Sequence, residues 1–242
     1  LQTFGLGEST AQQLVLDHCP DWPAAVSLSF RAGVPQLEIK LSVDDAAHLP
    51  LRDACRARLE QLFGDHILGE GDTRLAARVI DLARAAGLTV TCAESCTGGM
   101  IAQMITQVPG SSDVFPGGLV TYSNALKHSL LGVAESTLAA HGAVSEATVR
   151  AMLAGALDAT GADLGVAVSG VAGPGGGTPE KPVGTVWLAW GGRDEAQAVC
   201  LHWPVERVLF QTMVAAAGLD ALRRHLQGIA AQSFYLRQRR VI

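Results

Sequence analysis

One strand-to-helix junction constrains the fold of this chain most strongly. Residues 88–91 have the β-branched character of a strand, and the apolar run 100–105 predicts a helix. Between them the chain reads Cys-Ala-Glu-Ser-Cys-Thr-Gly-Gly, so Ser95 precedes the helix start. Unpaired backbone N–H groups and the helix dipole favour an anion at such a place. A serine there is also a common helix N-cap, and this segment alone leaves both interpretations open.

Apolar runs and amphipathic segments alternate along residues 71–228. We expect strands near residues 88–92, 118–122, 164–169, 183–190 and 196–203, and helices near 72–86, 99–106, 125–131, 145–160 and 205–227. Continuous apolar runs such as 164–168 are typical of strands covered on both faces. The pattern predicts an α/β fold: a three-layer α/β/α domain with a largely parallel sheet, an antiparallel edge and a basic tail at residues 229–242.

Residues 1–70 predict a small α+β domain. Its expected elements are helices at 8–18 and 44–63 and strands at 26–30 and 36–43, followed by a linker at 66–71. Residues 1–66 carry five Lys or Arg against nine Asp or Glu. This acidic balance repels phosphates, and a GXXG loop is absent. We therefore expect a structural or dimerising role and consider nucleic-acid binding unlikely.

Composition predicts a soluble, cytoplasmic protein. The chain is 48% hydrophobic over 242 residues, enough for a sizeable core. It contains neither a signal peptide nor an apolar run near the roughly 18 residues that span a bilayer. The five cysteines are scattered and odd in number, which fits reduced thiols, and no zinc-binding spacing occurs. We expect no metal site.

Three further segments are rich in glycine, serine and polar residues: 109–127, 142–146 and 169–185. With the first junction they form the ordered motifs AESCTGG, PGSS, VTYSNxxK, GAVSE, SGxAGP and KPVGTV. From about Asp72 to about Leu226 the chain thus resembles the C-terminal domain of the CinA family, which includes amidases that deamidate nicotinamide mononucleotide. Residues 1–8 resemble the entry to the KH-like domain of longer CinA proteins. Because the chain opens on Leu1, we expect a fragment without their first, molybdopterin-binding-type domain.

Amide hydrolysis requires a nucleophile, a base and donors for the oxyanion. The resemblance implies Ser95 as the nucleophile and Lys127 as the base. A lysine base needs burial or a cationic neighbour to lower its pKa from about 10.4 to roughly 7 to 8. Tyr122 is predicted to relay a proton or to orient Lys127, unless it is a core aromatic. Glu94, if it points inward, either positions Lys127 or keeps it charged.

The predicted oxyanion and substrate contacts come from loops rich in small and hydroxyl residues. They are Thr97, Gly98, Gly99, Ser112, Ser169, Gly170, Ala172 and Gly173, with Arg207. Amides at 96–99 suit an oxyanion, and the 170–177 loop suits the phosphate and ribose of a nucleotide. The guanidinium of Arg207 suits phosphate. Gln211 and Thr212 stand where relatives commonly carry further arginines, which predicts a weaker phosphate site or a different ligand.

The resemblance implies hydrolysis of nicotinamide mononucleotide to nicotinate mononucleotide and ammonia. GxGxxG and a Walker loop are absent, so no dinucleotide cofactor is expected. The expected partners are a small pyridine nucleotide and a second copy of the chain. The alternative is a non-catalytic protein that binds a nucleotide or a partner and regulates competence or the response to DNA damage. An ordinary pKa near 10 at Lys127 would favour that alternative.

Overall fold

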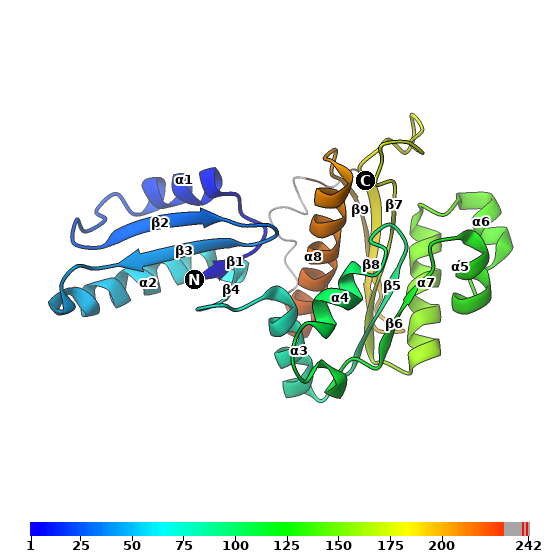
Figure 1. Ribbon diagram of the computed structural model, residues 1–242, viewed down its shortest axis with the longest axis horizontal. Coiled ribbons are helices and arrows are strands. Elements are labelled where there is room, and N and C mark those ends of the chain that lie inside the picture. The colour runs from blue at the N-terminus through cyan, green and yellow to red at the C-terminus, as the bar shows by residue number, and fades with distance from the viewer. Residues whose placement is uncertain (230–238, 240, 242) are drawn as a thin grey trace. The chain divides into compact units, whose positions relative to one another are not determined.

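The computed structural model describes residues 1–229, 239 and 241. The chain divides after Arg74 into two compact units, each with its own sheet (Figure 1). The predicted basic tail at 229–242 lies almost entirely outside the described residues. No helix in the described part of the chain is both long and apolar enough to cross a membrane.

The first unit packs two helices against a four-stranded antiparallel sheet of order β2-β3-β1-β4. Its elements are β1 (Gln2–Thr3), α1 (Glu8–His18), β2 (Ser27–Ala32), β3 (Leu37–Ser42), α2 (Leu49–Phe63) and β4 (Ile67–Gly69), with short 3-10 helices at Ala46–His48 and Gly64–His66. The core of the unit includes Val15, Ile39, Leu59 and Phe63. This α+β arrangement agrees with the predicted helices and the predicted strand pair.

Two strands of this unit were not expected. Residues 66–71, predicted as a linker, contain β4, which pairs antiparallel with β1. These strands are two and three residues long, too short to display the alternation that reveals a strand in a sequence. The second helix begins at Leu49 because Asp45 caps a separate 3-10 turn before it.

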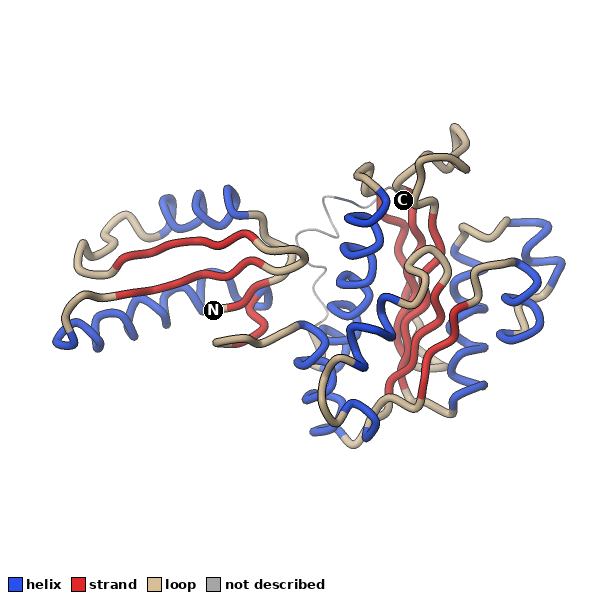
Figure 2. The backbone as a smooth tube through the Cα atoms, in the orientation of Figure 1, coloured by secondary structure: helices blue, strands red, loops and turns tan. Residues whose placement is uncertain are grey.

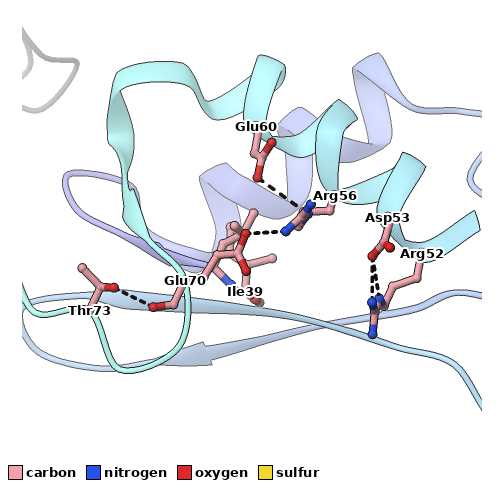
Figure 3. A network of polar contacts seen from close by, with 8 residues as sticks. Ile39, Arg52, Asp53, Arg56, Glu60, Glu70 and Thr73 are labelled. Carbon is pink, nitrogen blue, oxygen red and sulfur yellow. Dashed lines mark hydrogen bonds and ion pairs between the residues drawn. The ribbon is translucent and has the colours of Figure 1, made fainter. Parts of the chain in front are cut away.

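A polar network ties the chain after β4 to α2 (Figure 3). The guanidinium of Arg56 on α2 pairs with the carboxylates of Glu60 and Glu70. The hydroxyl of Thr73 donates to the carbonyl oxygen of Glu70 at 2.6 Å. Glu60 and Glu70 are exposed and Arg56 is half-buried, and ion pairs near the surface each contribute at most about 1 kcal/mol. The network therefore orders this segment more than it stabilises the unit.

The second unit contains a five-stranded sheet of order β6-β5-β7-β8-β9. Its strands are β5 (Val90–Glu94), β6 (Gly117–Val120), β7 (Leu164–Gly170), β8 (Thr185–Gly191) and β9 (Gln197–His202). The first three are mutually parallel, whereas β8 and β9 are antiparallel additions. Because β5, β6 and β7 run the same way, the residues that follow them meet at one edge of the sheet.

Helices cover both faces of this sheet (Figures 1 and 2). One face carries α3 (Leu75–Ala86), α4 (Met100–Thr106) and α8 (Arg207–Leu226). The other carries α7 (Glu146–Thr160), on which α5 (Asn124–Leu131) and α6 (Glu135–His141) pack. The predicted three-layer α/β domain is confirmed, with α6 as an unpredicted helix.

A close backbone approach fixes α5 on α7. A Cβ placed at Gly155 of α7 would lie 2.0 Å from the carbonyl oxygen of Leu131, the last residue of α5. Real Cβ atoms are not found so near a backbone oxygen. Glycine at this position therefore lets α5, which carries Lys127, pack directly against α7.

Candidate active site

Ser95 is the first residue after the central parallel strand β5. Its backbone N–H donates to the carbonyl oxygen of Val168 on β7 at 3.1 Å, and its own carbonyl oxygen accepts from the N–H of Gly98 at 3.2 Å. Gly98 and Gly99 then adopt positive φ angles of 64° and 105°, which glycine reaches without strain. This turn holds Ser95 at the carboxyl edge of the sheet, with 8% of its surface exposed.

Lys127 reaches Ser95 from the first turns of α5, the helix that follows β6. The side chain of Ser123 caps this helix. The Nζ atom of Lys127 lies 3.0 Å from Ser95 Oγ, 2.9 Å from the carbonyl oxygen of Thr121 and 3.2 Å from that of Tyr122. The side chain is almost fully buried, at 1% exposure. The structure thus brings the predicted serine and lysine into hydrogen-bond contact.

The burial of Lys127 disfavours its charged ammonium form. Burial lowers the pKa of Lys127 below its ordinary value, since a charged ammonium loses hydration there. Among the described residues, no carboxylate pairs with it. The two carbonyl oxygens can only accept hydrogen bonds, so each accepts one from an N–H group of the Lys127 amine. In the neutral amine the remaining tetrahedral position, a lone pair, then faces the hydroxyl of Ser95.

Glu94 is fully buried and caps α4. Its carboxylate accepts from the Thr97 hydroxyl at 2.6 Å and from the backbone N–H groups of Gly99, Ile101 and Ala102 at 2.8 to 3.0 Å. Neither role predicted for Glu94 beside Lys127 is found, because the turn after Ser95 brings the helix start over the carboxylate.

The predicted oxyanion donors are largely occupied within the turn. The Thr97 hydroxyl and the Gly99 N–H bind Glu94, and the Gly98 N–H binds the carbonyl oxygen of Ser95. The structure therefore differs from the prediction at Gly98 and Gly99. Within the described part of the chain, the N–H groups of Cys96 and Thr97 find no acceptor.

A cavity of about 250 Å³ opens at Ser95. It is lined by Ser95, Cys96, Tyr122, Asn124, Lys127, Ala143, Val144, Ser169, Gly170, Ala172 and Arg207. Seven of the predicted site residues are thus brought together from four separate segments. Asn124, Ala143 and Val144 were not predicted individually, although they belong to the motifs VTYSNxxK and GAVSE.

Arg207, the first residue of α8, joins two loops at the cavity. Its guanidinium donates to the carbonyl oxygen of Gly173 at 2.7 Å and to the hydroxyl of Tyr122 at 3.1 Å. Tyr122 is 60% exposed, so it is not a core aromatic. Its carbonyl oxygen, rather than its hydroxyl, contacts Lys127. The predicted proton relay through the Tyr122 hydroxyl is therefore not supported by this geometry.

Five predicted residues, Thr97, Gly98, Gly99, Ser112 and Gly173, are not among the described residues that line the cavity, whereas Ser169 is. Ser112 is an exposed residue of the 3-10 turn Ser111–Asp113, which precedes β6, whereas Ser95 follows β5. Because β5 and β6 are parallel, the two serines lie at opposite ends of these strands. Gly173 contributes its carbonyl oxygen to Arg207 and does not line the cavity. The Ser169 hydroxyl donates to the carbonyl oxygen of Ala143 at 2.7 Å and so anchors the cavity wall.

Two polar residues of α8 occupy the positions where further arginines were expected. The side-chain amide of Gln211 donates to the carbonyl oxygen of Cys96 at 2.9 Å. The hydroxyl of Thr212 donates to the carbonyl oxygen of Val208 in its own helix. Arg207 and Lys127 are therefore the cationic side chains among the cavity-lining residues.

The neighbouring thiol is poorly suited to be the nucleophile. Burial raises the pKa of Cys96 to about 12, so the thiolate that would attack is scarce near neutral pH. Burial also raises the pKa of Cys92. Ser95 remains the accessible nucleophilic group beside Lys127.

Fold and site together define a three-layer α/β protein with a buried serine and lysine pair at the carboxyl edge of its parallel strands. Residues 72–226 match the family model described as the CinA C-terminal domain. The chain belongs to the CinA family, which confirms the resemblance recognised in its motifs.

Relatives and solved structures agree with this assignment. A CinA-like protein of Colwellia psychrerythraea is 48% identical over 242 residues, covering 99% of this chain and 56% of the relative. One of Akkermansia muciniphila is 45% identical over 91% of this chain and 53% of its own. The chain therefore spans about half the length of the curated relatives it matches.

Two solved structures each match a little less than two thirds of this chain. A CinA superfamily protein from Klebsiella pneumoniae has a TM-score of 0.62 and 36% identity, covering 64% of this chain and 96% of its own. A competence/damage inducible protein from Agrobacterium tumefaciens has a TM-score of 0.61 and 42% identity, covering 63% and 93%.

Proposed function

We propose that this protein is an amidohydrolase that converts nicotinamide mononucleotide to nicotinate mononucleotide and ammonia. The observation that carries the proposal is the buried Nζ atom of Lys127, 3.0 Å from Ser95 Oγ and without a carboxylate partner among the described residues. A base near neutral pH requires such an environment.

In the first half of the proposed reaction, Lys127 accepts the hydroxyl proton of Ser95 while Oγ attacks the carboxamide carbon. The C–O bond forms and the carbonyl oxygen becomes an oxyanion. Lys127 then gives its proton to the amide nitrogen, the C–N bond breaks, and ammonia leaves. An ester between the nicotinate group and Ser95 remains.

In the second half, water replaces ammonia. Lys127 takes a proton from the water molecule as its oxygen attacks the ester carbon, and the proton then passes to Ser95 Oγ as the ester bond breaks. The backbone N–H groups of Cys96 and Thr97 are the proposed oxyanion donors in both halves, because each lacks an acceptor among the described residues. The scheme uses no metal.

Arg207 is the proposed phosphate ligand. The cavity of about 250 Å³ is small beside ligand pockets of roughly 300–1,000 Å³. We therefore place the pyridine ring near Ser95 and the phosphate at the opening, where the Arg207 guanidinium already binds the Tyr122 hydroxyl. A guanidinium suits a phosphate because its N–H groups form a planar fork.

The test is to incubate the purified chain with nicotinamide mononucleotide and a metal chelator, and to follow ammonia and nicotinate mononucleotide. Ser95→Ala should abolish turnover while leaving the circular dichroism spectrum unchanged. Full activity in folded Ser95→Ala would contradict the proposal.

Gln211 and Thr212 favour one rival function, because they leave Arg207 without neighbouring arginines for phosphate. In that case the protein binds a nucleotide or a partner without catalysis and serves a regulatory role in competence or DNA damage. Calorimetric binding of nicotinamide mononucleotide without product formation would favour the rival.

We also propose a cytoplasmic location and a homodimer. The cysteines are all free and buried, as in a reducing compartment. Val120, Leu126 and Leu130 are exposed apolar residues on β6 and α5 that a second copy would cover. Light scattering over a range of concentrations tests the dimer, and a monomer at every concentration would remove it.

A further inference from the structure

Gln211 links α8 to the turn that follows Ser95. Its side-chain amide donates to the carbonyl oxygen of Cys96 at 2.9 Å, across 115 positions of sequence. Gln211 also lies beside Gly98, since a Cβ placed on that glycine would be 3.9 Å from the Gln211 nitrogen. This side chain therefore binds the turn at Cys96 and lies close to Gly98.

The contact fixes the orientation of a peptide unit. The peptide bond between Cys96 and Thr97 is trans, and in a planar trans peptide the N–H points opposite to the C=O. Holding the Cys96 oxygen toward α8 therefore directs the Thr97 N–H away from α8. The preceding peptide is fixed in the same manner, because the Ser95 oxygen accepts from Gly98.

Both peptide units after the nucleophile thus have a bound oxygen and an N–H without an acceptor among the described residues. Cys96 and Thr97 are each only 3% exposed. Buried N–H groups are nearly always paired in folded proteins. Unpaired N–H groups beside a nucleophile have the chemistry that an oxyanion requires of its donors.

We propose that Gln211 is a positioning residue of the oxyanion site: it orients the Cys96–Thr97 peptide so that the Thr97 N–H is presented to the reacting carbonyl oxygen. The inference rests on the proposed amidase function and deepens it. Gln211 is not among the described residues that line the cavity, so its effect passes through the peptide it holds.

Gln211→Met tests this role, since methionine has a similar length and no donor. We expect kcat for nicotinamide mononucleotide to fall about 10- to 100-fold, because one oxyanion donor is misplaced. KM should stay within about twofold, because the ground-state amide oxygen depends less on that donor. Gln211→Arg retains a donor and should recover most of the lost kcat.

Thr212→Val is the matched control, because Thr212 is the next residue of α8 and bonds only within its own helix. It should leave kcat and KM unchanged. A kcat for Gln211→Met within twofold of this control would overturn the proposal. So would a parallel loss of kcat and of binding of the product nicotinate mononucleotide, which would indicate a general disturbance of the site.

A second measurement separates this inference from the proposed function. In spectra of ¹⁵N-labelled protein, the Thr97 amide resonance should shift in Gln211→Met and stay in place in Thr212→Val. A wild-type protein without turnover would contradict the amidase proposal. An unmoved Thr97 amide in Gln211→Met would contradict control of the peptide by Gln211, whether or not the protein is active.

Discussion

At the scale of single residues, the site depends on keeping Lys127 buried without a counter-charge. Such burial is costly, because the ammonium loses hydration that two carbonyl oxygens replace only in part. The proposed role of Lys127 as a base requires a lowered pKa, whereas a stable charged lysine requires hydration or a counter-charge.

Lys127→Met should abolish turnover and raise the melting temperature at pH 7. The pKa of Lys127 is lowered in the folded state, so the unfolded chain binds more protons than the native one between the two pKa values. The buried charge therefore destabilises the folded wild-type protein, and this destabilisation is complete at any pH below the folded pKa. It disappears as the pH rises past about 10.4, the ordinary pKa of lysine. The gain in Lys127→Met should therefore shrink between pH 7 and pH 10 in calorimetric scans. A variant less stable than wild type at pH 7 would contradict this account.

At the scale of elements, the turn between β5 and α4 depends on Glu94. Its carboxylate satisfies three backbone N–H groups and one hydroxyl, all near the start of α4. A helix of seven residues has little intrinsic stability of its own. The cap therefore holds both the helix and the turn that carries Ser95.

Glu94→Ala should lower the free energy of unfolding by about 2–4 kcal/mol, because it leaves several buried donors without an acceptor. Urea denaturation measures the change. Glu135→Ala, in the exposed first turn of α6, is the control and should change stability by less than about 1 kcal/mol. Equal effects of the two substitutions would show that Glu94 is dispensable as a cap.

The contact between α5 and α7 yields a second test at this scale. Gly155→Ala should destabilise the protein by about 1–3 kcal/mol or more, since the new methyl group would overlap the carbonyl oxygen of Leu131. It should also lower kcat by displacing Lys127. Gly175→Ala, where a Cβ meets nothing within 4 Å, should leave the free energy of unfolding unchanged and is the control for stability. Stabilisation by Gly155→Ala, usual for a helix interior, would contradict the packing.

The elements also show how far the sequence predicts the site. Ser95 and Lys127 follow successive parallel strands, so motif order and topology suffice to bring them together. Side-chain direction is less predictable: Glu94 turns toward α4 and Gln211 reaches a residue 115 positions away. Ser112 belongs to a recognised motif, yet the direction of β6 places it at the far edge of the sheet.

At the scale of the whole molecule, the chain consists of two units with separate cores. Among the described residues, those that line the cavity at Ser95 all belong to the second unit. A solved structure from Klebsiella pneumoniae matches 64% of this chain, and the match covers 96% of that structure. The second unit has a core of its own, as a domain that folds alone requires.

Residues 72–242 alone should fold and retain turnover of nicotinamide mononucleotide within a few-fold of the whole chain. Removal of residues 1–71 takes away none of the cavity-lining side chains. A thermal melt and a kinetic assay on both proteins make the comparison. A folded second unit without activity would show that the first unit contributes to catalysis.

The proposed reaction passes through an ester on Ser95. Hydroxylamine tests it directly, because it competes with water for such an ester and diverts the product to a hydroxamate. With increasing hydroxylamine, the account predicts that hydroxamate replaces nicotinate mononucleotide, that ammonia equals their sum, and that Ser95→Ala forms neither product. Ammonia matched by nicotinate mononucleotide alone at every hydroxylamine concentration, or no ammonia from the folded chain, would contradict it.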